Sequence, residues 1–265
     1  MASEDYLLDN RQSEAGQRFD ALGTLFNPST FRHMESMGLS LGWRVWEVGA
    51  GSASVPAWIA EQTKAHVLAT DIDTTWLDAA EDRFEVRRHD IGIEPAPDHA
   101  FDLVHARLVL VHVPQRHEAL ATMIDALRPG GWLLVEEADP GLQPLACPDE
   151  HGAAEDLANK LKLAFRALMA ERGVDLSFGR KLPRLLRAAG LVDVQSDAYF
   201  PIGGPVLNRL ESATVEQIRE RLIAAELASE DEIEEHLSNV ASGQLDLATS
   251  PMVSAWGSKP VDQGV

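Results

Sequence analysis

Short apolar runs alternate with segments of helical spacing through the first half of the chain. Five runs rich in Val, Leu and Phe predict strands, at residues 43–48, 65–70, 84–88, 101–105 and 132–136. Before the last run, four apolar residues recur at the spacing of one helix face, namely Leu120, Met123, Ile124 and Leu127. Strands separated by helical segments are typical of a parallel sheet. The pattern therefore predicts a doubly wound α/β fold.

The flanking regions are mainly helical. Residues 11–38 predict two helices broken at Asn27-Pro28, and a short helix is expected from Thr74 to Asp82. Beyond Asp139 the pattern predicts helices at 149–172, 182–189 and within 205–240, and strands at 191–200 and 252–256. The segment Arg128-Pro129-Gly130-Gly131 is expected to end the helix before the fifth strand.

The chain divides into three parts in this interpretation. Residues 1–40 form an N-terminal helical lid, residues 41–140 form the ligand-binding core, and residues 141–260 complete the sheet and add inserted helices. Neither an internal repeat nor a low-complexity linker separates them. We therefore expect the inserted helices to pack on the sheet, within a single structural domain.

A glycine turn follows the first predicted strand. Gly49-Ala50-Gly51 comes directly after the run that contains Glu47, and Pro56 suits the first turn of a helix capped by Ser54. Glycine allows positive φ and lets a ligand approach the backbone closely. A strand, a glycine turn and a helix start together present unpaired N–H groups to a ligand. The stretch predicts a site for a nucleotide-like cofactor.

Carboxylates at three successive strand ends narrow the choice of cofactor. Glu47 near the end of the first strand would repel a pyrophosphate and suits a ligand that carries an ammonium and a sulfonium. Asp71 ends the second strand, where a carboxylate accepts both hydroxyls of a ribose. Asp90 follows the third strand and is placed for an adenine amino group. The three acids favour a nucleoside without phosphates over a dinucleotide, and Ser54 also stands where NAD-binding turns carry glycine or alanine.

Composition limits the class of protein. The chain has 265 residues, of which 45% are hydrophobic, and a formal net charge of −19. This acidic balance disfavours nucleic acid as a partner, because phosphate backbones need clustered Lys and Arg. No apolar run reaches the length of a membrane span, and the acidic N-terminus does not resemble a signal peptide, so cytoplasmic localisation is expected. Cys147 is the single cysteine, and no histidine spacing indicates a metal site.

These motifs resemble those of the class I S-adenosylmethionine-dependent methyltransferases, in particular bacterial metal-independent enzymes that act on small molecules. The resemblance covers roughly residues 41–140. Its motifs are Glu47–Ala53 at the glycine turn, Thr70–Asp73, Arg88–Ile91, Phe101–Arg107 and Leu127–Trp132. Ala53 replaces a frequent third glycine of the first motif. The resemblance implies a Rossmann-like methyltransferase fold with a mostly parallel seven-stranded sheet, N-terminal helices and helical lid insertions.

The resemblance also implies roles for single residues around S-adenosylmethionine. The methionine end would be held by Glu47, Gly49, Ala50, Gly51 and Ser52, with the Ala106 carbonyl accepting from its ammonium. Asp71 would bind the ribose and Ile72 would pack beside the adenine, which Asp90 and the Ile91 amide would recognise. Trp76 either covers the adenine or belongs to the core or surface. Arg18 either reaches the methionine carboxylate or pairs with Glu14, four residues earlier on the predicted helix.

Methyl transfer needs alignment of the reactants, and an oxygen or nitrogen acceptor also needs a base that removes its proton. His112 follows the fourth strand and is the first candidate for the base, although a histidine at a helix entry also bonds to backbone. Arg107 either orients an anionic substrate or makes a structural ion pair. The inserted helices, rich in Leu, Ala and Ile, predict an enclosed apolar pocket for an aromatic or natural-product-like metabolite.

Three other classes stay open at this point. The chain could bind S-adenosylmethionine and catalyse a cyclisation or rearrangement, it could be a non-catalytic binding module on the same fold, or it could be a NAD enzyme, which Glu47 and Ser54 disfavour. A small-molecule acceptor is the expected partner, without nucleic acid or membrane. The assembly state, with a homodimer among the options, is not specified by the sequence.

Overall fold

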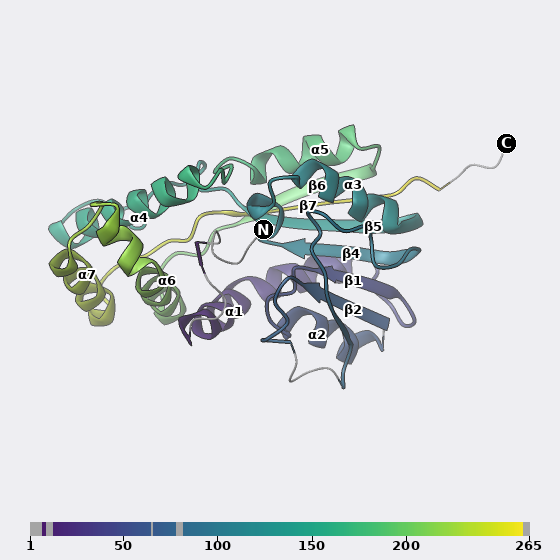
Figure 1. Cartoon of the computed structure of the whole chain (residues 1–265), viewed down its shortest axis with the longest axis horizontal. Coiled ribbons are helices and arrows are strands. Elements are labelled where there is room, and N and C mark those ends of the chain that lie inside the picture. Colours follow the sequence, from purple (N-terminus) through teal and green to yellow (C-terminus); the bar gives the residue numbers. More distant parts are fainter. Residues whose placement is uncertain (1–6, 9–12, 65, 78–81, 262–265) are drawn as a thin grey trace. The chain divides into compact units, whose positions relative to one another are not determined.

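The computed structural model describes residues 7–8, 13–64, 66–77 and 82–261, which group into two compact units. The sheet unit contains residues 27–138, 178–199 and those from Met252 onward. The helical unit contains the residues up to Phe26 together with 139–177 and 200–251. Helix α1 (Ser13–Ser36; Figure 1) contributes to both units, because the division between them falls between Phe26 and Asn27.

The sheet unit is built on seven strands in the order β3-β2-β1-β4-β5-β7-β6. The strands are β1 (Arg44–Val48), β2 (His66–Asp71), β3 (Glu85–Arg88), β4 (Phe101–Arg107), β5 (Leu127–Ala138), β6 (Val192–Tyr199) and β7 (Met252–Ser258). The first five pair in parallel, whereas β7 is antiparallel to both β5 and β6. The predicted doubly wound, mostly parallel seven-stranded sheet is therefore confirmed.

Helices cover both faces of this sheet (Figure 1). On one face, Met34 of α1 and Ile59 of α2 (Ser54–Thr63) share a core with alternate strand residues such as Val45 and Leu103. Helices α3 (Arg116–Ala126) and α5 (Leu182–Ala188) lie on the other face. Because side chains alternate along a strand, residues in step with Val45 and Leu103 point toward α1 and α2.

The helical unit has a core of its own. Helices α4 (Ala153–Glu171), α6 (Pro205–Ala224) and α7 (Glu230–Ser242) contribute buried Leu161, Ile218 and Ile233 to one cluster. Ser229 and Glu232 form a reciprocal capping box at the start of α7, which satisfies two N–H groups of the first turn. The Leu, Ala and Ile residues of the inserted helices predicted an apolar substrate pocket, but many of them pack against one another inside the helical unit. The three-part division of the chain and its assembly as a single domain stay predictions.

The expected break at Asn27-Pro28 is wrong, because α1 continues through Pro28. Proline removes one helical N–H donor and disfavours a helix interior. The second half of the helix is nevertheless held by tertiary contacts, since Met34 enters the sheet core and Thr30 bonds to Glu136. Packing therefore overrides the local preference.

Two further predictions about element boundaries are wrong, and a third falls partly outside the described residues. Ala53, not Ser54, occupies the N-cap of α2, and it makes no side-chain cap bond. Strand β5 begins already at Leu127, and its Pro-Gly-Gly segment bulges where the pairing with β4 shifts register. Of the helix expected at Thr74–Asp82, residues 75–77 form a turn and residues 78–81 lie outside the described part of the chain.

Candidate functional site

The carboxyl ends of four parallel strands bring the predicted residues to one edge of the sheet. Strand β1 ends at Val48, before the glycine turn, and the neighbouring β2 ends at Asp71. Strand β3 ends two residues before Asp90, and β4 ends at Arg107 on the other side of β1. In open α/β sheets, ligands bind outside this edge where the strand order reverses. Here the reversal falls between β1 and β4.

The glycine turn has the backbone shape that the sequence predicts. Gly49 and Gly51 have φ of +61° and +57°, in the left-handed region. A Cβ on Gly49 would also overlap the side chain of Val109, which follows β4. The Ala50 N–H donates to the Thr70 carbonyl at 3.0 Å, and the Gly51 N–H donates to Asp71 Oδ2 at 2.8 Å. These bonds fix the turn against the end of β2.

Asp71 is 6% exposed, and its carboxylate accepts hydrogen bonds from the glycine turn and from the segment that follows β2. Its Oδ1 accepts from the Asp73 N–H at 3.0 Å while Oδ2 holds Gly51. Burial raises the pKa of Asp71, and the backbone hydrogen bonds from Asp73 and Gly51 partly oppose the rise. Asp90 also shapes its own turn, because its Oδ1 accepts from the Gly92 N–H at 2.9 Å.

Apolar side chains lie near these acids. Ile72, directly after Asp71, is 45% exposed, and Trp76 is 37% exposed, whereas Ile91 beside Asp90 is buried. Large exposed apolar side chains are informative when they gather at a candidate ligand site. Ile72 thus offers apolar surface next to the Asp71 carboxylate, which suits a base and a sugar.

Glu47 belongs to a buried ionisable cluster, which we call the histidine–glutamate cluster and which consists of Glu47, His105, Glu136 and His33. Glu47 faces His105 in the register of β1 and β4, and their Oε2 and Nδ1 atoms lie 2.7 Å apart. The other ring nitrogen of His105, Nε2, lies 3.2 Å from Glu136 Oε2. His105 is fully buried, and both glutamates are almost so.

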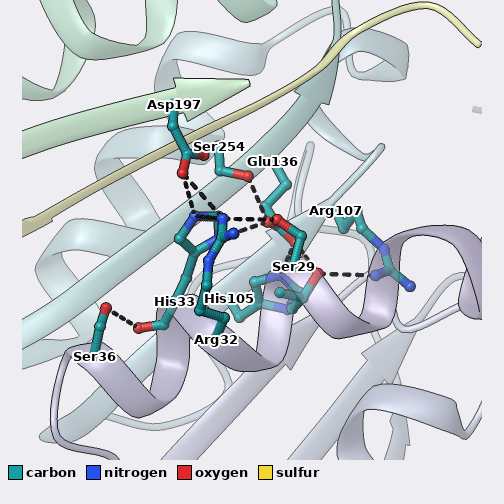
Figure 2. Close-up of polar contacts among 10 residues, drawn as sticks. Ser29, Arg32, His33, Ser36, His105, Arg107, Glu136, Asp197 and Ser254 are labelled. Atoms are coloured by element: carbon teal, nitrogen blue, oxygen red, sulfur yellow. Dashed lines mark hydrogen bonds and ion pairs between the residues drawn. The ribbon is translucent and has the colours of Figure 1, made fainter. Parts of the chain in front are cut away.

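Glu136 connects this cluster to α1 and to β7 (Figure 2). Its Oε2 accepts from the Thr30 hydroxyl, and its Oε1 accepts from the Ser254 hydroxyl at 2.6 Å. His33 lies between Glu136 and Asp197, with ring nitrogens 3.4 Å and 3.0 Å from their carboxylate oxygens. The three strand members of the cluster, Glu47, His105 and Glu136, lie on the sheet face covered by α1, in step with Val45, Leu103 and Leu134, and His33 meets them from α1.

The charges of the cluster follow from these contacts. Burial alone would lower the pKa of His105, but Glu47 and Glu136 outweigh it and raise the pKa to about 9. Burial likewise disfavours the ionised form of Glu136, yet hydrogen bonds from His105 and His33 hold its pKa well below the ordinary value. For His33, Glu136 and Asp197 overcome burial and raise the pKa. At neutral pH, His105 is therefore a cation between acids.

Arg107 contacts α1 from the end of β4. Its Nη1 donates to the Thr30 hydroxyl at 3.0 Å and its Nη2 donates to Asn27 Oδ1 at 2.9 Å. Of the two roles considered for Arg107, these contacts support the structural one, although through hydrogen bonds instead of an ion pair. Its role toward a substrate stays a prediction.

His112 lies in a short 3₁₀ helix, η2 (Leu110–His112), at the turn after β4. Glu137, next to Glu136 but on the opposite side of β5, organises this turn. Its Oε1 accepts from the N–H groups of Val109 and Leu110, at 3.2 Å and 2.6 Å. Burial raises the pKa of Glu137 to about 8, against the effect of these backbone donors. The turn that carries His112 is thus anchored to the sheet by one carboxyl group.

Two predicted residues need separate mention. Ala106 is fully buried in β4, between Val48 and Val135 of the adjacent strands. Arg18 belongs to the helical unit, where it is 6% exposed and its guanidinium lies 5.1 Å from the Phe19 ring centroid. The side chain of Glu14 lies outside the described residues, so the pairing of Arg18 with Glu14 stays a prediction.

Glu136, Glu137 and His33 were missed by the sequence interpretation. A pair of acids at the end of an apolar run, Glu136-Glu137, was the available signal, since it parallels Glu47 in β1. Among the described residues, no group of three or more His, Cys, Asp or Glu side chains is arranged to hold a metal ion. In the same part of the chain, every helix is too short or too polar to cross a membrane.

Comparison with known proteins decides the family. A methyltransferase-domain model matches residues 46–135, which contain the glycine turn and the strand-end acids. The chain is 30% identical to methyltransferase str3 of Strobilurus tenacellus, over 72% of its own length and 69% of the relative. The chain belongs to the class I S-adenosylmethionine-dependent methyltransferases.

Other methyltransferases are also similar to this chain, and the chain spans only part of their length. Methyltransferase str2 of Strobilurus tenacellus is 35% identical over 55% of this chain, and the chain spans 52% of that relative. A Haemonchus contortus phosphoethanolamine N-methyltransferase 2 structure, solved with S-adenosyl-L-methionine, matches 98% of this chain and 60% of its own with a TM-score of 0.61. At 16% identity this structural match speaks for the fold alone. Family membership identifies S-adenosylmethionine as the cofactor.

Proposed function

We propose that this methyltransferase transfers the methyl group of S-adenosylmethionine to a small organic acceptor, an aromatic or natural-product-like metabolite methylated on oxygen or carbon. The observation that carries the proposal is the sheet edge, where a glycine turn of positive φ lies beside Asp71 and above the buried Glu47. A Cβ at Gly49 would overlap the side chain of Val109, so the close packing of this turn requires glycine.

The residues at the edge fit S-adenosylmethionine, which supplies an electrophilic methyl group when bound. In the proposal, Glu47, the loop from Gly49 to Ser52 and the Ala106 carbonyl hold the methionine end. Asp71 accepts from the ribose hydroxyls, and Ile72 packs beside the adenine. Asp90 and the Ile91 amide recognise the adenine edge. The partly exposed Ile72 and the buried carboxylate of Asp71 support this assignment.

Catalysis by this chain rests on positioning and on removal of a proton. His112 is proposed as the base, because its turn follows β4 and is tied to the sheet through Glu137. A positioned base contributes roughly 10²–10⁴-fold to such a step. Arg107 is proposed to orient the acceptor, and Arg18 to bind the methionine carboxylate. The inserted helices stay the proposed source of the acceptor-shaping apolar surface, and the half-exposed Leu163 of α4 is among their available side chains.

Calorimetry with S-adenosylmethionine, followed by turnover on a panel of phenols, polyketides and related metabolites, tests the proposal. Acceptor-dependent release of S-adenosylhomocysteine is the expected result. Product formation without that release would instead indicate a cyclisation or rearrangement. Binding without any chemistry across the panel would favour a binding module. Preference for NAD over S-adenosylmethionine would overturn the cofactor assignment.

A further inference from the structure

The two carboxylates that flank His105 are held very differently. Glu136 has polar contacts with Thr30, Ser254 and His33 in addition to His105. For the side chain of Glu47, His105 is the one hydrogen-bond partner among the described residues. Removing His105 would therefore leave Glu136 fixed by α1 and β7, whereas Glu47 would lose the contact that orients it.

The position of Glu47 makes this dependence relevant to the ligand. Glu47 is two residues before Gly49, the first residue of the glycine turn, and it is 2% exposed. Its carboxylate is therefore a buried charge next to the turn that is proposed to hold the methionine end. A carboxylate offers about four lone-pair sites on two oxygens. With Oε2 engaged by His105 at 2.7 Å, Oε1 is the oxygen left for an ammonium donor.

Stability alone explains the cluster poorly. Replacing a buried ion pair with apolar residues is often neutral or stabilising, so such a pair is weak evidence of a structural need. The same face of the sheet is otherwise apolar at Val45, Leu103 and Leu134. The three ionisable residues on adjacent strands at this edge are therefore better explained by a role in orienting a side chain of the ligand site.

We propose that His105 is a positioning residue of the cofactor site, which orients the Glu47 carboxylate toward the ammonium of the methionine end and is itself anchored by Glu136. The inference rests on the proposed function, because it assumes that Glu47 contacts this ammonium. It assigns to His105 no contact with the cofactor. Replacement of His105 should therefore weaken binding of the methionine end of the ligand and leave binding of the adenosine end unchanged.

Two ligands that share the adenosine end separate this role from a general structural one. S-adenosylhomocysteine carries the amino-acid ammonium, whereas 5′-methylthioadenosine ends at the sulfur. By calorimetry, His105→Phe should weaken S-adenosylhomocysteine at least tenfold and change 5′-methylthioadenosine less than threefold. Val104→Ala is the matched control, because Val104 is equally buried in β4 but points to the opposite face. It should leave both affinities within threefold.

Double variants keep the test decisive if His105→Phe does not fold. His105→Gln retains one N–H donor, and Glu47→Gln removes the charge that His105 orients. In the Glu47→Gln background, His105→Gln should cause no further loss of S-adenosylhomocysteine affinity. Equal weakening of both ligands by His105→Phe, unchanged affinity for S-adenosylhomocysteine in His105→Phe or in Glu47→Gln, or additive losses in the double variant would overturn the positioning role. Failure of the wild type to bind either ligand would instead overturn the proposed cofactor site.

Discussion

Glu47 of β1 and His105 of β4 stand directly opposite each other in the sheet, with Oε2 and Nδ1 2.7 Å apart in the protein interior. Glu136 approaches the other side of the same imidazole, at 3.2 Å. A charge is expensive to bury unless it is paired and hydrogen-bonded, and here each ring nitrogen of His105 meets a carboxylate. The protonated imidazole of His105 therefore stabilises the two buried carboxylates.

Stability should fall at alkaline pH through the loss of this proton. The folded pKa of His105 is raised from 6.5 to about 9, so its contribution is fully present below pH 6.5 and is lost as pH rises through about 9. The groups that face His105 are Glu47 on β1 and Glu136 on β5, with His33 on α1 and Arg107 on β4 nearby in the charge network. The raised pKa of His105 contributes on the order of 3 kcal/mol to the free energy of unfolding below pH 6.5.

Urea denaturation of wild type and His105→Gln from pH 6 to pH 10 measures this contribution. The wild type should be more stable at pH 6, and the difference should shrink toward zero by pH 10. Taking the difference cancels other alkaline titrations, including that of Glu137. A gap that is independent of pH would show that His105 is not a buried cation.

Glu136 and Glu137 are adjacent buried acids, and we predict that their replacement by glutamine lowers stability to very different extents. Glu136→Gln should cost about 3–5 kcal/mol at pH 7, because His105 and His33 lose their shared counter-charge in the core. Glu137→Gln should cost less than about 1 kcal/mol, because Glu137, with a pKa of about 8, is already mostly neutral and an amide oxygen can still accept from Val109 and Leu110. Similar losses in urea unfolding would contradict the charge assignment.

The sheet could be predicted from sequence because each strand is encoded locally. The apolar runs, the glycine turn after Val48 and the acid at Asp71 carry their own signals within a few residues. Parallel order then forces these ends to one edge. The placement of the glycine turn next to Asp71 at this edge was predictable for the same reason, and their roles toward the cofactor stay predictions.

The histidine–glutamate cluster and the continuity of α1 could not be predicted, because they depend on residues that are far apart in the chain. His33 meets Asp197 across 164 residues, and Thr30 meets Glu136 across 106, so no local pattern announces either contact. The continuity of α1 through Pro28 has the same origin, since contacts with the sheet override a local helix breaker. Glu136 was predicted as the last residue of the fifth strand, and nothing in the local sequence indicated that its carboxylate is buried among distant partners.

Gly49 is predicted to tolerate no side chain, for two separable reasons. Gly49→Ala meets both a positive φ and the side chain of Val109, whereas Gly38→Ala meets a φ of +84° with nothing within 4 Å. The Gly38 variant should cost about 1 kcal/mol, and the Gly49 variant should cost more and abolish S-adenosylmethionine binding. Adding Val109→Ala to Gly49→Ala should recover part of the lost stability. Unaltered calorimetric affinity in Gly49→Ala would remove the turn from the cofactor site.

Asp71→Asn should weaken S-adenosylmethionine at least tenfold while the protein stays folded. An asparagine oxygen can still accept from one of the two backbone donors, Gly51 or Asp73, but the carboxylate needed for two ribose hydroxyls is lost. Asp73→Asn is the matched control, because Asp73 accepts locally from Thr75 and should bind the cofactor as wild type does. Comparable affinities of the two variants for S-adenosylmethionine would argue against a ribose contact at Asp71.

His112→Ala should separate chemistry from binding once an acceptor is known. If His112 removes the acceptor proton, turnover should drop by about 10²–10⁴-fold while the dissociation constant of S-adenosylmethionine stays near the wild-type value. The acidic limb of the wild-type profile of kcat against pH should also disappear in the variant. His117→Ala offers a nearby control, since His117 is an exposed residue in the first turn of α3. A loss below about tenfold would mean that the turn after β4 positions the acceptor and that another group or water takes the proton.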